Sequence, residues 1–178
     1  MKLGQLPIFA AAALLVCGVS CSQPSSDGAA VLRFTAIPDD NATELQAKFE
    51  PVAAYLSESL GVDVSYIPTA SYAASVEAFR NGDIQLAWFG GLTGVQARSQ
   101  VSGAVAIAQG KVDPNYHSYF IAHIDAGFSA VDPTAASGQF PMALGGKSFT
   151  FGSPSSDSGR LMPEHFIRLN TGQSPTDF

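Results

Sequence analysis

The chain has 178 residues, of which 46% are hydrophobic and 13% are charged, and its formal net charge at pH 7 is −6. That length suits one domain, or one lobe with part of a second. An acidic chain without a basic cluster is not expected to bind nucleic acid or anionic lipid headgroups, although a small anion responds only to the local field of its pocket.

Residues 1–20 have the pattern of a secretory signal peptide. Lys2 precedes an apolar run over residues 6–18 that is too short to span a membrane. Residues 18–21 (GVSC) resemble the bacterial lipobox, in which the cysteine is acylated and becomes the mature N-terminus, although a lipobox usually begins with Leu. Two interpretations stay open: a lipoprotein anchored to the membrane through Cys21, or a non-lipidated signal that is cleaved nearby. Both predict a periplasmic or other extracytoplasmic location.

Cysteine and histidine usage excludes several kinds of site in the exported part of the chain. Both cysteines, Cys17 and Cys21, lie at the start of the full sequence, so no disulfide, thiol nucleophile or cysteine metal site is expected beyond Cys21. The three histidines are His117, His123 and His165. They do not have a tight metal-binding spacing, and we expect neither a metal nor a cofactor.

Strand and helix patterns alternate after a Ser-, Gly-, Gln- and Pro-containing stretch at 21–30, which predicts a flexible tether. Residues 31–37 predict a strand. Asn41 followed by Glu44 resembles the capping box of a helix that runs to residue 60 and stops at Gly61. Pro51 lies inside that helical pattern and is expected to kink or split the helix.

The next elements continue the alternation. Strands are expected at 62–67, 84–89 and 104–108, and helices at 71–81 and 92–99. This order predicts an α/β fold, in which helices cover both faces of a parallel sheet.

A second unit is expected to begin near Tyr116. It would contain a strand at 117–124, a polar loop at 125–138, a helical turn at 140–144 and a strand at 148–151 before the last helix. A strand and one helix cannot cover both faces of a parallel sheet. We therefore expect that the chain is a fragment whose C-terminal part is missing.

The segment FTFGSPSSDSGRLMPEHFIR (149–168) predicts a hydroxyl-rich loop and then a helix that begins near Ser158. Four serines surround this predicted helix start: Ser153, Ser155, Ser156 and Ser158. Hydroxyl donors, free N–H groups and the partial positive charge of a helix N-terminus together favour a small oxyanion. Gly159 would let a ligand approach the backbone, because it has no Cβ.

Arg160 falls in the first turn of this predicted helix. A cation is electrostatically disfavoured there unless a bound anion pairs with it. The alternative is an ordinary N-cap at Ser158 with a solvated Arg160.

Four stretches of the sequence carry a resemblance to a known family. They are LRFTAIPDDNATELQAKFEPVAAYLSESLGVDVSYIP (32–68), SYAASVEAFRNGDIQLAWFGG (71–91), YHSYFIAH (116–123) and FGSPSSDSGRLMPEHFIR (151–168). In this order they resemble the phosphonate/phosphite-type solute-binding proteins of ABC importers, and within them the selenate-binding subgroup. The resemblance extends over 32–178 and implies a type II periplasmic-binding-protein fold, with a ligand cleft between two α/β lobes.

The resemblance divides the chain into lobe 1 at 31–112, a crossover or hinge at 113–124 and an incomplete lobe 2 at 125–178. It implies ligand contacts from the first lobe, the crossover and the Ser-rich loop. Gly159 of the same loop is added to these contacts. The candidate ligand-binding residues are therefore Tyr72, Gly90, Gly91, Tyr116, Ser118, Ser155, Ser156, Ser158 and Gly159.

Asp157 departs from the family pattern. Relatives commonly have Ser-Thr-Ser-Gly where this chain has Ser-Asp-Ser-Gly at 156–159. A carboxylate beside a dianion would be repulsive. We expect Asp157 to face solvent, and the alternative is a preferred anion that is protonated or less charged.

Together these features predict a membrane-anchored, periplasmic solute-binding protein rather than an enzyme. It would capture a small oxyanion of the phosphonate, phosphite or selenate kind and deliver it to the transmembrane subunits of an ABC permease by closing its lobes. One alternative is a ligand-sensing module of a signalling system. Another is a serine hydrolase that uses Ser156 or Ser158 with His123 or His165, although the G-x-S-x-G elbow is absent.

Overall fold

The computed structural model describes residues 30–129, 140 and 142–178. The predicted signal peptide, the acylation site at Cys21, most of the tether and part of the loop at 125–138 lie outside these residues. Within the described ranges, the chain has no helix with the length and apolar character needed to cross a bilayer.

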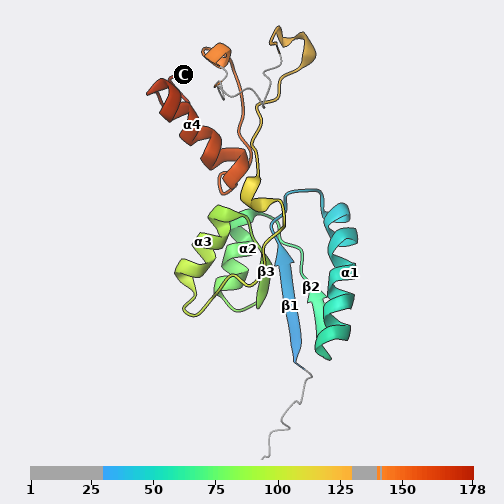
Figure 1. Cartoon of the computed structure of the whole chain (residues 1–178). Coiled ribbons are helices and arrows are strands. Elements are labelled where there is room, and N and C mark those ends of the chain that lie inside the picture. Colours follow the sequence, from blue (N-terminus) through green and yellow to red (C-terminus); the bar gives the residue numbers. More distant parts are fainter. Residues whose placement is uncertain (1–29, 130–139, 141) are drawn as a thin grey trace, which may run out of the picture.

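A three-stranded parallel sheet forms the centre of the N-terminal half, in the order β2-β1-β3. β1 (Val31–Ala36) lies between β2 (Asp63–Tyr66) and β3 (Leu86–Trp88), as Figure 1 shows. These strands fall inside the ranges predicted from the sequence. The connections between them are helical, as a parallel sheet requires.

The helix α1 (Ala42–Leu60) begins and ends where its sequence signals predict. The Asn41 side chain accepts a hydrogen bond from the Glu44 N–H at 3.0 Å, and Gly61 ends the helix with a φ of 67°. Of the two effects predicted for Pro51, the split is wrong, because the helix is continuous through it, and the kink stays a prediction. Pro51 is exposed, so water can satisfy the carbonyl that loses its partner in the preceding turn.

The main core lies between α1 and one face of the sheet. Phe34 of β1 packs against Phe49 of α1 and Tyr66 of β2, with ring centroids 6.0 and 5.3 Å apart. The cluster of buried side chains consists of Phe34, Ala36, Leu45, Phe49, Ala53 and Tyr66. Burial of these apolar groups is the main stabilising contribution in this half of the chain.

The opposite face of the sheet is covered by α2 (Tyr72–Arg80) and α3 (Gly91–Gln100). Figure 1 shows both helices on the side of the sheet that faces away from α1. Thr35, which alternates with the core residues of β1, is buried on this side, as is Thr93 of α3. The prediction that helices cover both faces is therefore confirmed for these three strands.

The predicted strands at 104–108, 117–124 and 148–151 are wrong. These residues form no strand, and the apolar side chains of Val105, Ile107 and Ile121 are 73%, 76% and 93% exposed. Their apolar, β-branched composition favours extended backbone, but a strand also needs a neighbouring strand to pair with. Among the described residues, these three segments have no such partner.

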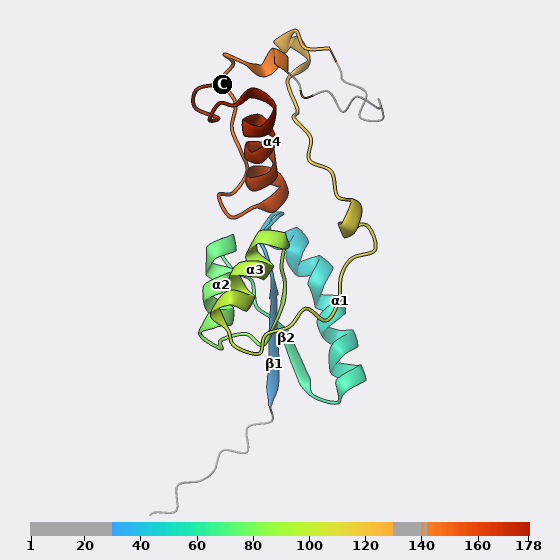
Figure 2. The same cartoon turned by 60° about the vertical axis from the view of Figure 1, so that its left-hand side comes forward.

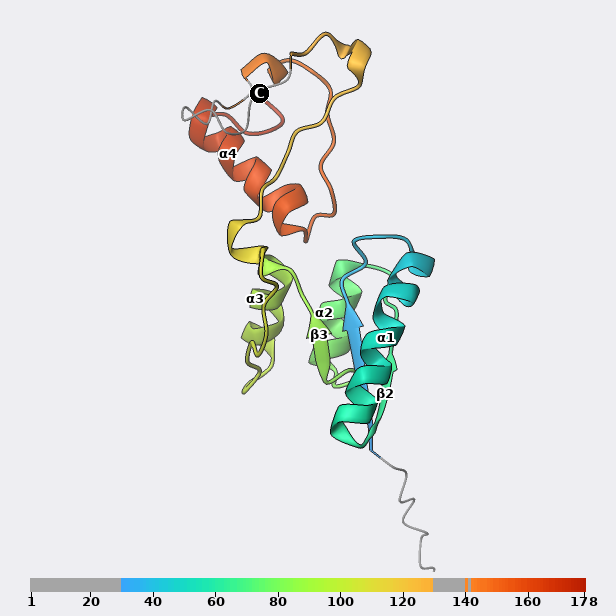
Figure 3. The ribbon, with the colours of Figure 1, turned by 45° about the vertical axis from the view of Figure 1, so that its right-hand side comes forward.

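The rest of the described chain consists of short helical turns and one longer helix. η1 (Asp113–Asn115) and η2 (Ile124–Ala126) follow α3, and η3 (Met142–Leu144) coincides with the helical turn predicted at 140–144. The π-helical turn η4 (Asp157–Leu161) leads directly into α4 (Met162–Thr171). Figures 2 and 3 show the start of this last helix beyond the carboxyl ends of the strands, next to α3.

Candidate functional site

Three helix N-termini meet beyond the carboxyl ends of the parallel strands. α2 begins at Tyr72, α3 begins at Gly91, and η4, which continues as α4, begins at Asp157. Each N-terminus presents N–H groups without an intrahelical partner and a partial positive charge. This edge of an open parallel sheet is also where α/β proteins bind ligands.

Ser156 fixes the start of the C-terminal helix. Its Oγ accepts a hydrogen bond from the Gly159 N–H at 3.0 Å, and its carbonyl accepts one from the Leu161 N–H at 3.0 Å, the five-residue spacing of a π-turn. The side chain is buried. The helical segment begins at Asp157, within one residue of the predicted start near Ser158, and its N-cap is Ser156 rather than Ser158 as in the alternative prediction.

Gly159 holds the loop closed by close backbone packing. Its carbonyl accepts a hydrogen bond from the Gly152 N–H at 2.8 Å. A Cβ at position 159 would lie 2.9 Å from the Ser156 Oγ and 3.3 Å from the Gly152 Cα. Any other residue would push the two sides of the loop apart. Glycine at position 159 is therefore needed for the loop to close, in addition to its predicted role of letting a ligand approach the backbone.

Tyr72 links the first half of the chain to the serine loop. Burial raises the pKa of its phenol above the ordinary value of 10.0, while a hydrogen bond with the Ser156 hydroxyl acts in the opposite direction. The nearby Asp39 carboxylate and Tyr116 raise this pKa further. The phenol is therefore protonated at neutral pH and can donate a hydrogen bond to an anion. Tyr72 and Ser156, predicted from two separate motifs, are joined here by a hydrogen bond, and exposed Tyr116 acts on the pKa of Tyr72 only electrostatically.

The Asp157 carboxylate lies over the first residue of α3. A Cβ at Gly91 would be 2.5 Å from its Oδ2 and 3.2 Å from its Cγ, so the carboxylate fills the space that a side chain at position 91 would take. The prediction that Asp157 faces solvent is wrong, because this half-buried side chain faces a predicted ligand-binding glycine. The sequence could not show this, since the contact joins two distant segments.

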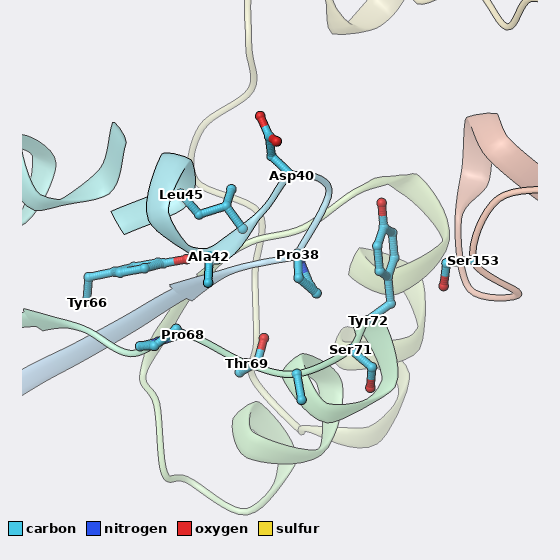
Figure 4. Close-up of a pocket in the computed structure, with 11 residues that line it drawn as sticks. Pro38, Asp40, Ala42, Leu45, Tyr66, Pro68, Thr69, Ser71, Tyr72 and Ser153 are labelled. Atoms are coloured by element: carbon cyan, nitrogen blue, oxygen red, sulfur yellow. The ribbon is translucent and has the colours of Figure 1, made fainter. Parts of the chain in front are cut away.

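A hollow of about 440 Å³ opens beside Tyr72, at the same edge of the sheet. Figure 4 shows the Tyr72 ring beside it and Ser153 on the facing loop. The lining residues are Pro38, Asp40, Ala42, Leu45, Tyr66, Pro68, Thr69, Ala70, Ser71, Tyr72 and Ser153. Most of them follow the ends of β1 and β2 and were not predicted as site residues. Pro38 and Pro68 directly follow the strands predicted at 31–37 and 62–67, and they were the signal that could have located this part of the site.

The structure does not bring all predicted residues into this junction. Gly90 is the N-cap of α3 and lies beside Gly91. Ser118 is exposed on the extended segment after η1 and does not line the hollow. Ser155 and Ser158 are half-buried, and neither side chain forms a hydrogen bond within the described part of the chain.

The Arg160 side chain already has two partners, Glu164 and the ring of Phe151. Its Nε lies 3.0 Å from Oε2 of Glu164, and its guanidinium lies 4.4 Å from the centre of the Phe151 ring. The prediction that it stands ready to pair with an anion is wrong in this structure, because a carboxylate one helical turn later and an aromatic face already engage it.

The histidines named in the hydrolase alternative lie elsewhere. His123 contacts Asp125, with both side chains exposed, and His165 packs against Phe166 of α4. The described residues also contain no group of His, Cys, Asp and Glu side chains arranged to hold a metal ion.

Comparison with known proteins shows the family. Residues 34–178 match the family described as "ABC transporter, phosphonate, periplasmic substrate-binding protein". The chain belongs to this family. Because the family consists of substrate-binding proteins, the prediction that the chain is not an enzyme is confirmed.

Two relatives and one solved structure illustrate the match to the phosphonate-binding family. A probable ABC transporter phosphite binding protein, PhnD1 of Prochlorococcus marinus, is 40% identical over 146 residues, covering 82% of this chain and 48% of the relative. The phosphate-import protein PhnD of Mycolicibacterium smegmatis is 31% identical over 139 residues, covering 74% of this chain and 40% of the relative.

The structure of P. marinus PhnD1 in complex with methylphosphonate superimposes with a TM-score of 0.65 at 36% identity, covering 83% of this chain and 53% of that chain. The predicted periplasmic-binding-protein fold of mixed α/β class is thereby confirmed. The chain spans about half the length of the curated relatives it matches.

Proposed function

We propose that the chain captures a tetrahedral phosphorus oxyanion, a phosphonate or phosphite, outside the cytoplasm for uptake by an ABC importer. The observation that carries this proposal is the meeting of the α2, α3 and η4 N-termini around Tyr72, Ser156 and Gly91. Backbone N–H groups and the phenol can donate several hydrogen bonds to one oxyanion there. Backbone N–H groups and a protonated phenol are neutral donors, and none of the described residues that line the adjacent hollow is Lys or Arg.

The names of the relatives support a phosphorus oxyanion as the ligand. One is named for phosphite, one for phosphate import, and the solved relative holds methylphosphonate. Selenate has the same tetrahedral shape and remains a competing ligand in the proposal. The remaining predicted contacts, from Gly90, Tyr116, Ser118, Ser155, Ser158 and Gly159, belong to the same proposed site.

The transport role extends the proposal beyond the described residues. In it, the lobe at 31–112 and the partial lobe at 125–178 close around the anion through the crossover at 113–124, and the closed form docks on the permease. Acylation of Cys21 would hold the protein at the membrane. A sensor that shares the fold would bind the same anion, so ligand binding alone does not separate the two roles.

Thermal unfolding of the chain against a panel of anions tests the ligand class. The panel contains methylphosphonate, phosphite, phosphate, sulfate and selenate. A phosphorus oxyanion present at about 100 times its Kd should stabilise the folded chain by about 2.7 kcal/mol and raise Tm accordingly.

Two variants show whether the shift arises at the proposed site. Ser156→Ala should abolish it, whereas Ser99→Ala, near the far end of α3, should leave it unchanged. A chain whose Tm responds to none of the phosphorus oxyanions contradicts the proposal.

A further inference from the structure

We propose that Asp157 is a specificity-determining residue that restricts the site to oxyanions carrying a proton, such as hydrogen phosphite and singly charged alkylphosphonates. The inference rests on the proposed function, because it concerns the ligand of that same site. It separates two groups of tetrahedral anions that have nearly the same shape.

The Asp157 carboxylate lies at the start of α3. Asp157 Oδ2 occupies the space above Gly91, the first residue of α3. The N-cap of α3, Gly90, provides no side-chain hydrogen bond, and the first turn of this helix contains no acidic residue. The Asp157 carboxylate therefore supplies the negative charge at the positive end of α3, from a different part of the chain.

Asp157 also begins its own helix. It directly follows the N-cap Ser156 in η4. The carboxylate thus lies between the two N-termini that the proposed function assigns to the oxyanion. A bound ligand in this junction has a carboxylate oxygen as a neighbour, together with the N–H donors.

The nearest cation to Asp157 in its own helix, Arg160, is already paired with Glu164. The titratable and charged groups of the surrounding elements are Asp39 and Asp40 after β1, Tyr72, Glu77 and Arg80 of α2, Arg98 of α3, Tyr116 of the crossover, Arg160 of η4, and Glu164, His165 and Arg168 of α4. Within the described part of the chain, Asp157 has no salt bridge that would neutralise it.

The chemical consequence follows from hydrogen-bonding capacity. An ionised carboxylate only accepts hydrogen bonds, so it repels a fully ionised anion and attracts one that carries an O–H group. A phosphonate or phosphite has its second ionisation near neutral pH, as phosphate esters do at about 6, and its monoanion retains one O–H. The ligand hydroxyl donates to the Asp157 carboxylate, and the remaining oxygens accept from the helix N-termini. Sulfate and selenate carry no proton near neutral pH and cannot make this contact.

Binding of methylphosphonate, selenate and sulfate, measured by calorimetry between about pH 5.5 and pH 9, tests the inference in the chain. Binding of the monoanion alone predicts that Kd for methylphosphonate rises about tenfold per pH unit above the second pKa of the ligand. Asp157→Asn can donate to a dianion, so the rise should fall below about twofold per unit. The same variant should bind selenate and sulfate at least about tenfold more tightly than the wild type.

Two further variants control for the loss of a carboxylate elsewhere and for disturbance of the turn. Asp63→Asn removes a carboxylate from the exposed start of β2, at the opposite end of the sheet, and should keep the wild-type pH profile. Asp157→Thr provides a hydroxyl donor in case the amide disturbs the turn, and it should flatten the profile as Asp157→Asn does.

The possible failures are distinguishable. Tight methylphosphonate binding with a flat wild-type pH profile, or an Asp157→Asn profile as steep as the wild type, overturns the inference and leaves the proposed function standing. No binding of any phosphorus oxyanion at any pH, in the wild type and all variants, overturns the proposed function and the inference with it.

Discussion

The residues before and after position 100 differ in what holds them in place. Residues 31–100 form a sheet with a helix layer on each face and contain nearly all of the buried apolar side chains. Of the described residues after 100, only Ser156 and Ile167 are buried, and the serine loop is fixed by hydrogen bonds and close glycine packing. The first region is a scaffold, and the second brings polar groups to the edge of that scaffold. Buried apolar side chains therefore stabilise the first region, whereas polar contacts and glycine packing hold the described part of the second.

Truncating the core should have the largest effect. Phe34→Ala removes a ring that packs against two other aromatic rings, and should lower the free energy of unfolding by about 3–5 kcal/mol. Ile121→Ala, at a 93% exposed position of the second region, should change it by less than about 0.5 kcal/mol. Urea denaturation of both variants measures the two free energies of unfolding. Equal losses would contradict the claim that the first region carries most of the stability.

Loss of the serine cap should have a smaller and more local effect. Ser156→Ala removes the acceptor for the Gly159 N–H and should cost about 1 kcal/mol. Hydrogen exchange should accelerate at Gly159 and the first turn of α4 but not in β1. Ser158→Ala is the matched control and should leave this exchange unchanged. If Ser158→Ala has the larger effect, the assigned N-cap is wrong.

Coupling between the regions can be measured across the contact of Gly91 with Asp157. Gly91→Ala places a Cβ 2.5 Å from Oδ2 and must displace the carboxylate, whereas Gly94→Ala in the same helix meets only an ordinary contact of 3.6 Å. A double-mutant cycle of Gly91→Ala with Asp157→Ala should show a coupling of at least about 0.5 kcal/mol. The cycle with Gly94→Ala should show none. Additive effects in both cycles would mean that the regions are independent here.

The smallest expected effect is a pH dependence of α4. Hydrogen bonds from Arg168 and Arg160 lower the pKa of Glu164 below its ordinary value of 4.5. A carboxyl whose pKa is lower in the folded state stabilises the fold above its unfolded pKa, and this contribution is lost as the pH falls through the folded pKa. Exchange in α4 should therefore accelerate below about pH 4.5 relative to β1, and Glu164→Gln should remove this acid-induced change. If exchange in α4 of the Glu164→Gln variant still accelerates at acid pH as in the wild type, Glu164 is not the group responsible.

The scaffold was largely predictable from the sequence because its signals are local. Asn41 caps α1 and Gly61 ends it as predicted, and α2, which Ser71 caps, lies within the predicted range 71–81. Such signals depend on side chains a few residues apart. Pro51 was the exception, because a proline's effect depends on whether solvent reaches the freed carbonyl.

The later region was less predictable because its signals need distant partners. Residues 104–108 and 117–124 have strand-like composition, but a strand forms only with a pairing edge. Within the site, the joining of Tyr72 with Ser156 agreed with the predicted motifs. The orientation of Asp157 and the engagement of Arg160 did not, since each is set by a tertiary contact that spacing alone does not show.

The most direct test of the proposed site is an amide NMR titration of the chain with methylphosphonate. The account predicts that the largest shifts occur at the N-termini of the three converging helices, at the amides of Tyr72, Gly91, Ser156 and Gly159. The amides near Asp63, at the far end of the sheet, should not respond. Saturable shifts confined to other parts of the molecule, or no shifts, would contradict the claim that these helix N-termini form an oxyanion site.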